Sequence, residues 1–90
     1  MSQVTASHIL VNTLAEAMEL HEKIVNGGNF AEIAMNHSLC PSKANGGNLG
    51  SFGRGQMVKP FEDTAFECPI GAMSQPVQTQ FGYHLILRTA

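Results

Sequence analysis

Two histidines lie within short apolar runs near opposite ends of the sequence, His8 in the run 7–11 and His84 in the run 82–87. Both runs have the composition of β-strands. A histidine in such a strand needs hydrogen bonds to its ring nitrogens, or it is a working group that titrates or contacts substrate. If the two strands pair, the two rings can meet. For each histidine taken alone, a core residue with satisfied hydrogen bonds is the commoner role. Whether the two form a functional site therefore depends on the other candidate residues.

Other side chains could complete a site around the two histidines. The polar candidates are Cys40, Thr79 and Gln80, and the apolar candidates are Leu49, Met57, Phe61 and Phe81. Tight turns and the start of a helix could gather the apolar group around one cleft. Methionine adapts its shape to a ligand, and phenylalanine offers flat faces that suit a small apolar ring.

Three further kinds of site fit the sequence less well. Cys40 beside a histidine could be a nucleophile, but a short chain leaves little room for a substrate channel and an oxyanion site. His37 and Cys40 have the spacing of zinc ligands, but a second ligand pair of that form is missing. The glycines from Gly46 to Gly55 lack the pattern of a phosphate-binding loop, which favours a loop bent to shape a pocket. We therefore predict neither a metal nor a cofactor.

The spacing of apolar and turn-forming residues predicts the element order β-α-α-β-α-β-β. Thr13 with Glu16, and Asn29 with Glu32, are typical of capped helix starts. The expected elements are a strand over 3–11, helices over 13–26 and 29–37, a turn or single-turn helix over 40–45, a glycine-rich stretch over 46–55, a helix over 60–67, and strands over 75–80 and 83–89.

The apolar residues of the two first helices predict which of their faces turn inward. For the first helix the expected stripe is Leu14, Ala17, Met18, His21, Ile24 and Val25. For the second helix the expected inner face is Phe30, Ile33, Ala34 and His37.

Length and charge limit the classes of function. Ninety residues form a single domain, 1–90, with one modest core. The net charge of −2 and the scattered basic residues give no electrostatic case for nucleic acid. No apolar run approaches the roughly 20 residues that span a bilayer, and the N-terminus lacks the pattern of a signal peptide. Two cysteines make no disulfide framework. We expect a cytoplasmic monomer that binds neither nucleic acid nor membrane.

Five blocks of the sequence, taken together and in order, resemble the parvulins, a family of small peptidyl-prolyl cis/trans isomerases. The blocks are SHILV at 7–11, HSLCPS at 37–42, GGNLGSF at 46–52, GQMVKPF at 55–61 and TQFGYH at 79–84. The resemblance covers about Ala6 to Thr89. It implies an α+β fold of the parvulin or FKBP-like type, with a four-stranded antiparallel sheet wrapped by about four helices in the order β-α-α-α-β-α-β-β. In that fold the first and last strands are neighbours.

The resemblance also implies roles for single residues. His8 and His84 match the paired active-site histidines of the family, Cys40 matches a position that carries Cys or Asp, and Thr79 matches a hydroxyl of the histidine network. These four are the predicted catalytic residues. The predicted substrate-binding residues are the proline pocket and its surroundings, Leu49, Met57, Phe61, Phe81, Phe52 and Gln56.

The implied function is catalysis of rotation about X-Pro peptide bonds by a non-covalent mechanism. The partners would be proline-containing peptides and unfolded or partly folded proteins. Phosphate-directed parvulins carry a basic loop after the first strand, but no Lys or Arg precedes Lys23 here, so phosphorylated substrates are not expected. The alternative is a non-catalytic peptide-binding or chaperone module that uses the same cleft. The intact set of polar residues favours the isomerase.

Overall fold

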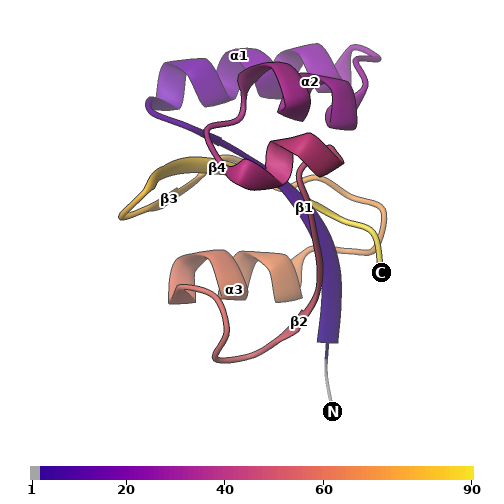
Figure 1. The fold of residues 1–90 in the computed structure, drawn as a ribbon, viewed down its shortest axis with the longest axis vertical. Helices are drawn as coiled ribbons and strands as arrows, with labels where there is room; N and C mark the ends of the chain where they lie inside the picture. Colours follow the sequence, from indigo (N-terminus) through magenta and orange to yellow (C-terminus); the bar gives the residue numbers. More distant parts are fainter. Residues whose placement is uncertain (1–2) are drawn as a thin grey trace.

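The computed structural model describes residues 3–90 and contains the predicted elements in the predicted order. Within these residues, three α-helices and one short 3-10 helix accompany four strands (Figure 1). The bounds are β1 (Gln3–Val11), α1 (Leu14–Val25), α2 (Phe30–His37), η1 (Pro41–Asn45), β2 (Asn48–Gly53), α3 (Lys59–Glu67), β3 (Val77–Thr79) and β4 (Gly82–Arg88). The segment after Cys40 is thus the fourth, 3-10 helix. No helix among these residues is long and apolar enough to cross a bilayer.

The four strands form one antiparallel sheet in the order β2-β1-β4-β3. The first and last strands are therefore neighbours at its centre, as predicted. In their register His8 pairs with Ile86, and Leu10 pairs with His84. Since side chains alternate between the faces of a strand, these four residues share one face of the sheet.

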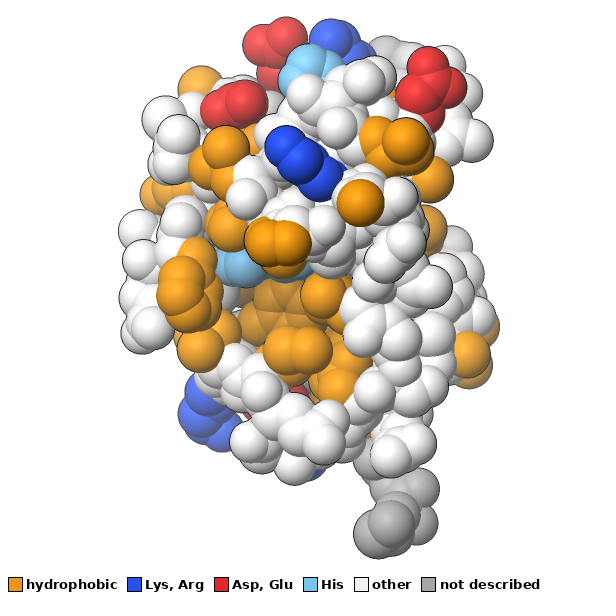
Figure 2. Space-filling view, in the orientation of Figure 1, with side chains coloured by type: hydrophobic (Ala, Val, Ile, Leu, Met, Phe, Trp, Pro, Cys, Tyr) orange, Lys and Arg blue, Asp and Glu red, His pale blue; other side chains and the backbone are white. Residues whose placement is uncertain are grey.

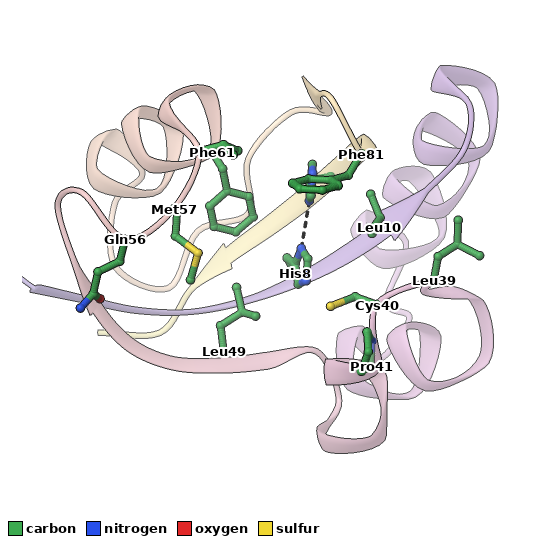
Figure 3. Close-up of a pocket in the computed structure, with 12 residues that line it drawn as sticks. His8, Leu10, Leu39, Cys40, Pro41, Leu49, Gln56, Met57, Phe61 and Phe81 are labelled. Atoms are coloured by element: carbon green, nitrogen blue, oxygen red, sulfur yellow. Dashed lines mark hydrogen bonds between the residues drawn. The ribbon is translucent and has the colours of Figure 1, made fainter.

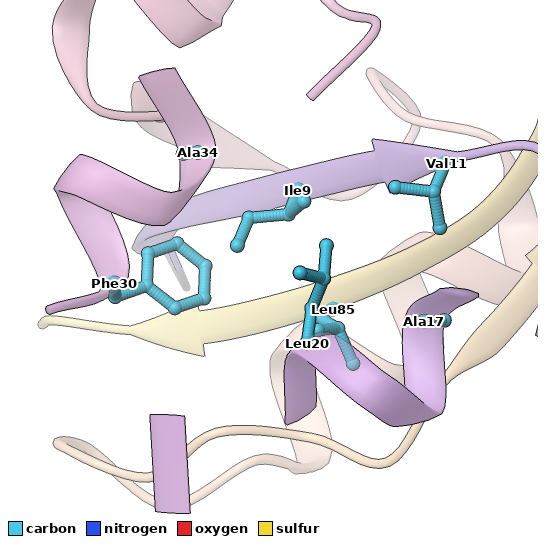
Figure 4. Packing of buried hydrophobic residues seen from close by; sticks show 7 residues of the cluster. All are labelled: Ile9, Val11, Ala17, Leu20, Phe30, Ala34 and Leu85. Atoms are coloured by element: carbon cyan, nitrogen blue, oxygen red, sulfur yellow. The ribbon is translucent and has the colours of Figure 1, made fainter. Parts of the chain in front are cut away.

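Helices cover both faces of the sheet, so the core has two halves (Figure 1). On one face, Ile9 and Leu85 pack against Leu20 of α1 and Phe30 of α2 (Figure 4). The opposite face, which carries the histidines, packs against α3. The buried residues of this half of the core, from the sheet and from α3, are Val4, Ala6, Phe52, Phe61, Ala65 and Ile86.

The helix starts agree with the sequence, and the inner faces of α1 and α2 agree in part. Thr13 and Asn29 accept hydrogen bonds from the backbone N–H of Glu16 and Glu32, as helix caps do. The buried residues of α1 are Ala17 and Leu20, whereas the predicted stripe members Leu14, Met18 and Val25 are exposed. Ala17 and Ile24 of that stripe do pack against the core, so the prediction was correct on this side of α1 and wrong for Leu14, Met18 and Val25. The inward side continues to Leu20, which the stripe did not include. His37 was also predicted to face inward and is exposed.

The C-terminal hairpin differs from the prediction in its bounds. The strand expected over 75–80 is only Val77–Thr79, and the last strand runs from Gly82 rather than from 83. Pro76 has no backbone N–H, which limits pairing at the start of this edge strand. Thr79 pairs with Gly82, so the turn is Gln80–Phe81 and not the two residues between the predicted strands, Phe81 and Gly82.

Candidate active site

An open cleft of about 490 Å³ lies on the face of the sheet that carries the histidines. Apolar side chains gather in this hollow, with histidine at its upper edge (Figure 2). The predicted residues that line it are His8, Cys40, Leu49, Gln56, Met57, Phe61, Phe81 and His84 (Figure 3). Leu10, Leu39, Pro41 and Val58 also line it and were not predicted.

The two histidines form a direct hydrogen bond, which rules out two separately satisfied core residues. The Nδ1 atoms of His8 and His84 lie 3.0 Å apart (Figure 3). The rings are stacked, with centroids 5.1 Å apart and an interplanar angle of 17°. Phe61 presents an edge-on contact to both rings, at centroid distances of 5.4 and 5.2 Å. Both histidines are buried, with 5% and 4% of their surface exposed.

Thr79 extends this pair into a chain of hydrogen bonds. Its Oγ1 lies 2.7 Å from His84 Nε2 and accepts the backbone N–H of Phe81 at 3.1 Å. The turn at the end of β3 therefore fixes the hydroxyl, and the hydroxyl fixes the ring of His84. The other end of the chain is His8 Nε2, a buried atom without a hydrogen-bond partner among the described residues. Whichever tautomers are present, the unsatisfied position of the chain is this nitrogen.

Both rings are neutral at physiological pH. Burial lowers the pKa of His84 from 6.5 to about 4. Burial, together with the repulsion from a charged His84, lowers the pKa of His8 to about 4 as well. A ring that donates from one nitrogen can then accept at the other, which a doubly protonated ring cannot do.

The three residues of the predicted proline pocket, Leu49, Met57 and Phe61, line the cleft together. Phe61 is buried and belongs to the core, whereas Phe81 on the other side of the cleft is 58% exposed. Phe52 does not line the cleft but packs behind Phe61, with ring centroids 6.1 Å apart. These positions give a packed apolar floor and a more exposed rim.

Cys40 lines the cleft but is not part of the hydrogen-bonded chain. It is half-buried, and no hydrogen bond among the described residues joins its Sγ to either histidine. Its place is set by Ser38, whose Oγ accepts the backbone N–H of Leu10 at 3.0 Å and of Cys40 at 3.3 Å. Leu39 N–H in turn donates to Leu10 O at 2.8 Å.

Sequence reasoning missed these supporting residues. Ser38 lies directly after α2 and is buried, which local composition does not reveal. Ser42 in η1 also has a buried hydroxyl without a partner in the described part of the chain. Leu10 could have been found, because it lies two residues after His8 and so on the same face of the strand.

The walls of the cleft carry no charge. None of its lining residues within 3–90 is Lys, Arg, Asp or Glu. The nearby cation Arg54 is engaged by Glu62 and Asp63. Within the same range, no group of three or more His, Cys, Asp or Glu side chains could hold a metal ion.

Comparisons with known proteins bear on the family of this chain. The family model described as rotamase, PPIC-type PPIASE domain, matches residues 7–90. The foldase protein PrsA of Geobacillus sp. (strain WCH70) is 47% identical over 85 residues, which cover 93% of this chain but only 31% of that protein. The peptidyl-prolyl cis-trans isomerase Pin1 of Arabidopsis thaliana is 47% identical over 87 residues, covering 91% of this chain and 73% of that protein.

A solved structure gives the same result for the fold. The solution structure of NmPin, the parvulin of Nitrosopumilus maritimus, superimposes with a TM-score of 0.90 at 42% identity. The match covers 100% of this chain and 98% of NmPin, so the whole fold is shared. With the family model, the sequence identity and the fold in agreement, the chain belongs to the parvulins, the family of PPIC-type peptidyl-prolyl isomerase domains.

Proposed function

We propose that this chain is an active peptidyl-prolyl cis/trans isomerase that acts on X-Pro bonds in peptides and in unfolded or partly folded proteins, and so assists folding. The observation that carries the proposal is the chain Thr79–His84–His8 beside an uncharged cleft that contains Leu49, Met57 and Phe61. A surface that only binds peptides has no need of the buried polar chain, whose desolvation is costly.

The reaction requires no bond to be broken. Rotation about a peptide bond is opposed by a barrier of about 18–20 kcal/mol that comes from amide resonance. At the twisted transition state this resonance is lost, and the amide has less charge separation than in either planar form. An apolar cleft that excludes water therefore favours the twisted state, and each 1.36 kcal/mol of that preference gives about a tenfold higher rate.

The cleft supplies the two parts that this mechanism needs. We assign Leu49, Met57 and Phe61 to hold the proline ring, so that the ring is the fixed side of the rotation. The chain through His84 and His8 sets the polarity of the wall near the rotating carbonyl. Cys40 acts through its electrostatic effect and not as a nucleophile, a role supported by the lack of a hydrogen bond from its Sγ to either ring within the described residues.

Exchange spectroscopy by NMR on an Ala-Pro peptide tests the function. We expect catalytic amounts of the protein to produce exchange between the cis and trans signals of the peptide. Chemical-shift changes on binding without exchange would favour the alternative, a binding or chaperone module.

The Cys40→Ser variant tests the non-covalent role of Cys40 in the same experiment. We expect exchange to persist, and its complete loss with peptide binding intact would contradict that role.

Thr79→Val should lower kcat/KM by about tenfold or more, since it leaves the buried His84 Nε2 without a partner at a typical cost of about 1–3 kcal/mol. Thr79→Ser is the matched control because it keeps the hydroxyl. Protease-free isomerisation kinetics on the Ala-Pro peptide measure both variants. Equal losses for valine and serine would contradict the role of the hydroxyl, because serine keeps it.

Phosphorylation of the residue before proline should not raise turnover, because the cleft has no cation in its described lining to receive a phosphate. The comparison uses Ser-Pro and phosphoserine-Pro peptides of otherwise identical sequence. A several-fold gain in kcat/KM with the phosphopeptide would refute the expected lack of phosphate recognition.

The setting in which the chain works is also a proposal. We infer a cytoplasmic monomer, independent of nucleic acid and membrane. The support is that the cysteines of the described chain, Cys40 and Cys68, are free thiols, which reducing compartments maintain. Light scattering of the purified protein and fractionation of cells test these two points, and a dimer or a secreted product would contradict them.

A further inference from the structure

The loop between β2 and α3 forms one lip of the cleft. Residues 54–58 connect the two elements, and Gln56, Met57 and Val58 line the cleft from this loop. The position of Met57 relative to Phe61, which follows in the first turn of α3, sets the width of the proline pocket. Something must therefore hold this loop in place.

Glu62, the residue after Phe61, holds the loop through its carboxylate. Its Oε1 accepts a hydrogen bond from the backbone N–H of Gly55, and its Oε2 accepts one from Arg54 Nη1 at 3.1 Å. The residue is buried, with 7% of its surface exposed. A buried carboxylate is costly unless it is paired and hydrogen-bonded. Here both partners come from the loop, so the buried charge connects the lip to α3.

Arg54 and Gln56 complete the connection. The Arg54 guanidinium also lies 3.4 Å from Asp63 Oδ1 and 4.5 Å from the centroid of the Phe66 ring. Gln56 Oε1 accepts the backbone N–H of Gly53 at 3.0 Å, which closes the start of the loop. The amide oxygen of Gln56 is thus used within the loop.

We propose that Glu62 is a positioning residue for substrate binding, which holds Met57 at the distance from Phe61 that the proline ring requires. The inference rests on the proposed function. It adds that α3 holds the loop 54–58 in its binding position before substrate binds. Because Glu62 bonds to the loop and to neither histidine within the described residues, it should govern how tightly the proline is bound and not how fast the bound amide rotates.

The test compares Glu62→Gln with Glu67→Gln, an exposed residue at the end of the same helix. Loss of the charged hydrogen bonds should raise KM for the Ala-Pro peptide by about tenfold and leave kcat within about twofold. The dissociation constant of the peptide, measured by NMR titration, should rise by a similar factor. In the free protein, the Met57 methyl signal should shift or broaden. Glu67→Gln should match the unmodified chain in all of these.

Two results would overturn the inference. One is an unchanged KM with an unchanged Met57 signal. The other is a fall in kcat with KM constant, which is the result of a smaller folded fraction and hence of a purely structural role. If Glu62→Gln fails to fold, the variant Arg54→Gln replaces it in the test. Arg54 has an exposed side chain and is one of the two partners of Glu62, so its loss must raise KM by a smaller factor. An unchanged KM there also overturns the inference.

Failure of the proposed function gives a different pattern. If the unmodified chain binds the peptide without isomerising it, the isomerase proposal fails. The role of Glu62 is then decided by the dissociation constant and the Met57 signal alone.

Discussion

Replacement of Gly47 by alanine should destabilise the protein by about 3 kcal/mol or more and should abolish the site with it. Gly47 has a φ of +86°, and a Cβ added at this position would overlap the carbonyl oxygen of His8. The carbonyl of Gly47 also accepts the His8 backbone N–H at 2.9 Å. The clash therefore displaces the segment of β1 that presents the His8 ring.

Gly50→Ala is the matched control, because Gly50 lies in β2 with a φ of +74°, but a Cβ added there would meet no described atom within 4 Å. It should cost only the conformational penalty of a left-handed residue, about 1–2 kcal/mol. Urea unfolding of both variants gives the comparison, and the signals of the His8 and His84 rings report the geometry of the site. Equal losses of stability would show that the contact with His8 is not the cause.

The free energy of unfolding should rise steeply with pH between about pH 5 and 6.5. In this window the unfolded histidines bind a proton near their ordinary pKa of 6.5, whereas His8 and His84 in the folded protein stay neutral because their pKa is about 4. The unfolded state thus binds more protons, so stability is lost as the pH falls. Each ring contributes a slope that approaches about 1.4 kcal/mol per pH unit.

Urea unfolding at several pH values measures this slope, and His84→Gln should reduce it by the contribution of one ring. Work above about pH 5 keeps most carboxylates ionised, so they add little to the slope. NMR titration of the folded protein offers a separate check. If the ring signals of His8 and His84 titrate near pH 6.5 in the native state, the burial argument is wrong.

The order of the elements could be predicted from the sequence because helix caps and apolar periodicity are local signals. The pairing of β1 with β4 could not be derived in this way, since it joins strands from opposite ends of the chain, and it followed only from the family resemblance. In α1, the pattern did not distinguish the stripe through Leu20 from the one through Met18. That choice depends on how closely Ala17 allows the helix to approach the sheet.

The site residues were predictable where a residue type is characteristic of the family's site. They were less predictable where the local backbone geometry decides which way a side chain points. His8, His84 and Thr79 lie together as the resemblance to the parvulins implied. Cys40 reaches the cleft, but its thiol stays outside the hydrogen-bonded chain. Gln56, a predicted substrate-binding residue, lines the cleft, but its amide oxygen accepts the backbone N–H of Gly53. Whether a polar side chain turns to a ligand or to its own loop depends on a bend that composition does not encode.

The central position of the first and last strands has a consequence for folding. The hydrogen bond between His8 and His84 joins residues 76 positions apart, so the site requires closure of a long loop with its entropic cost. The hydrogen bonds within helices α1 and α2 are local and can begin to form earlier, but an intermediate with these helices alone contains neither of the two rings. Catalytic competence should therefore appear together with the completed sheet, and recovery of activity in a refolding experiment would report the late pairing of β4 with β1.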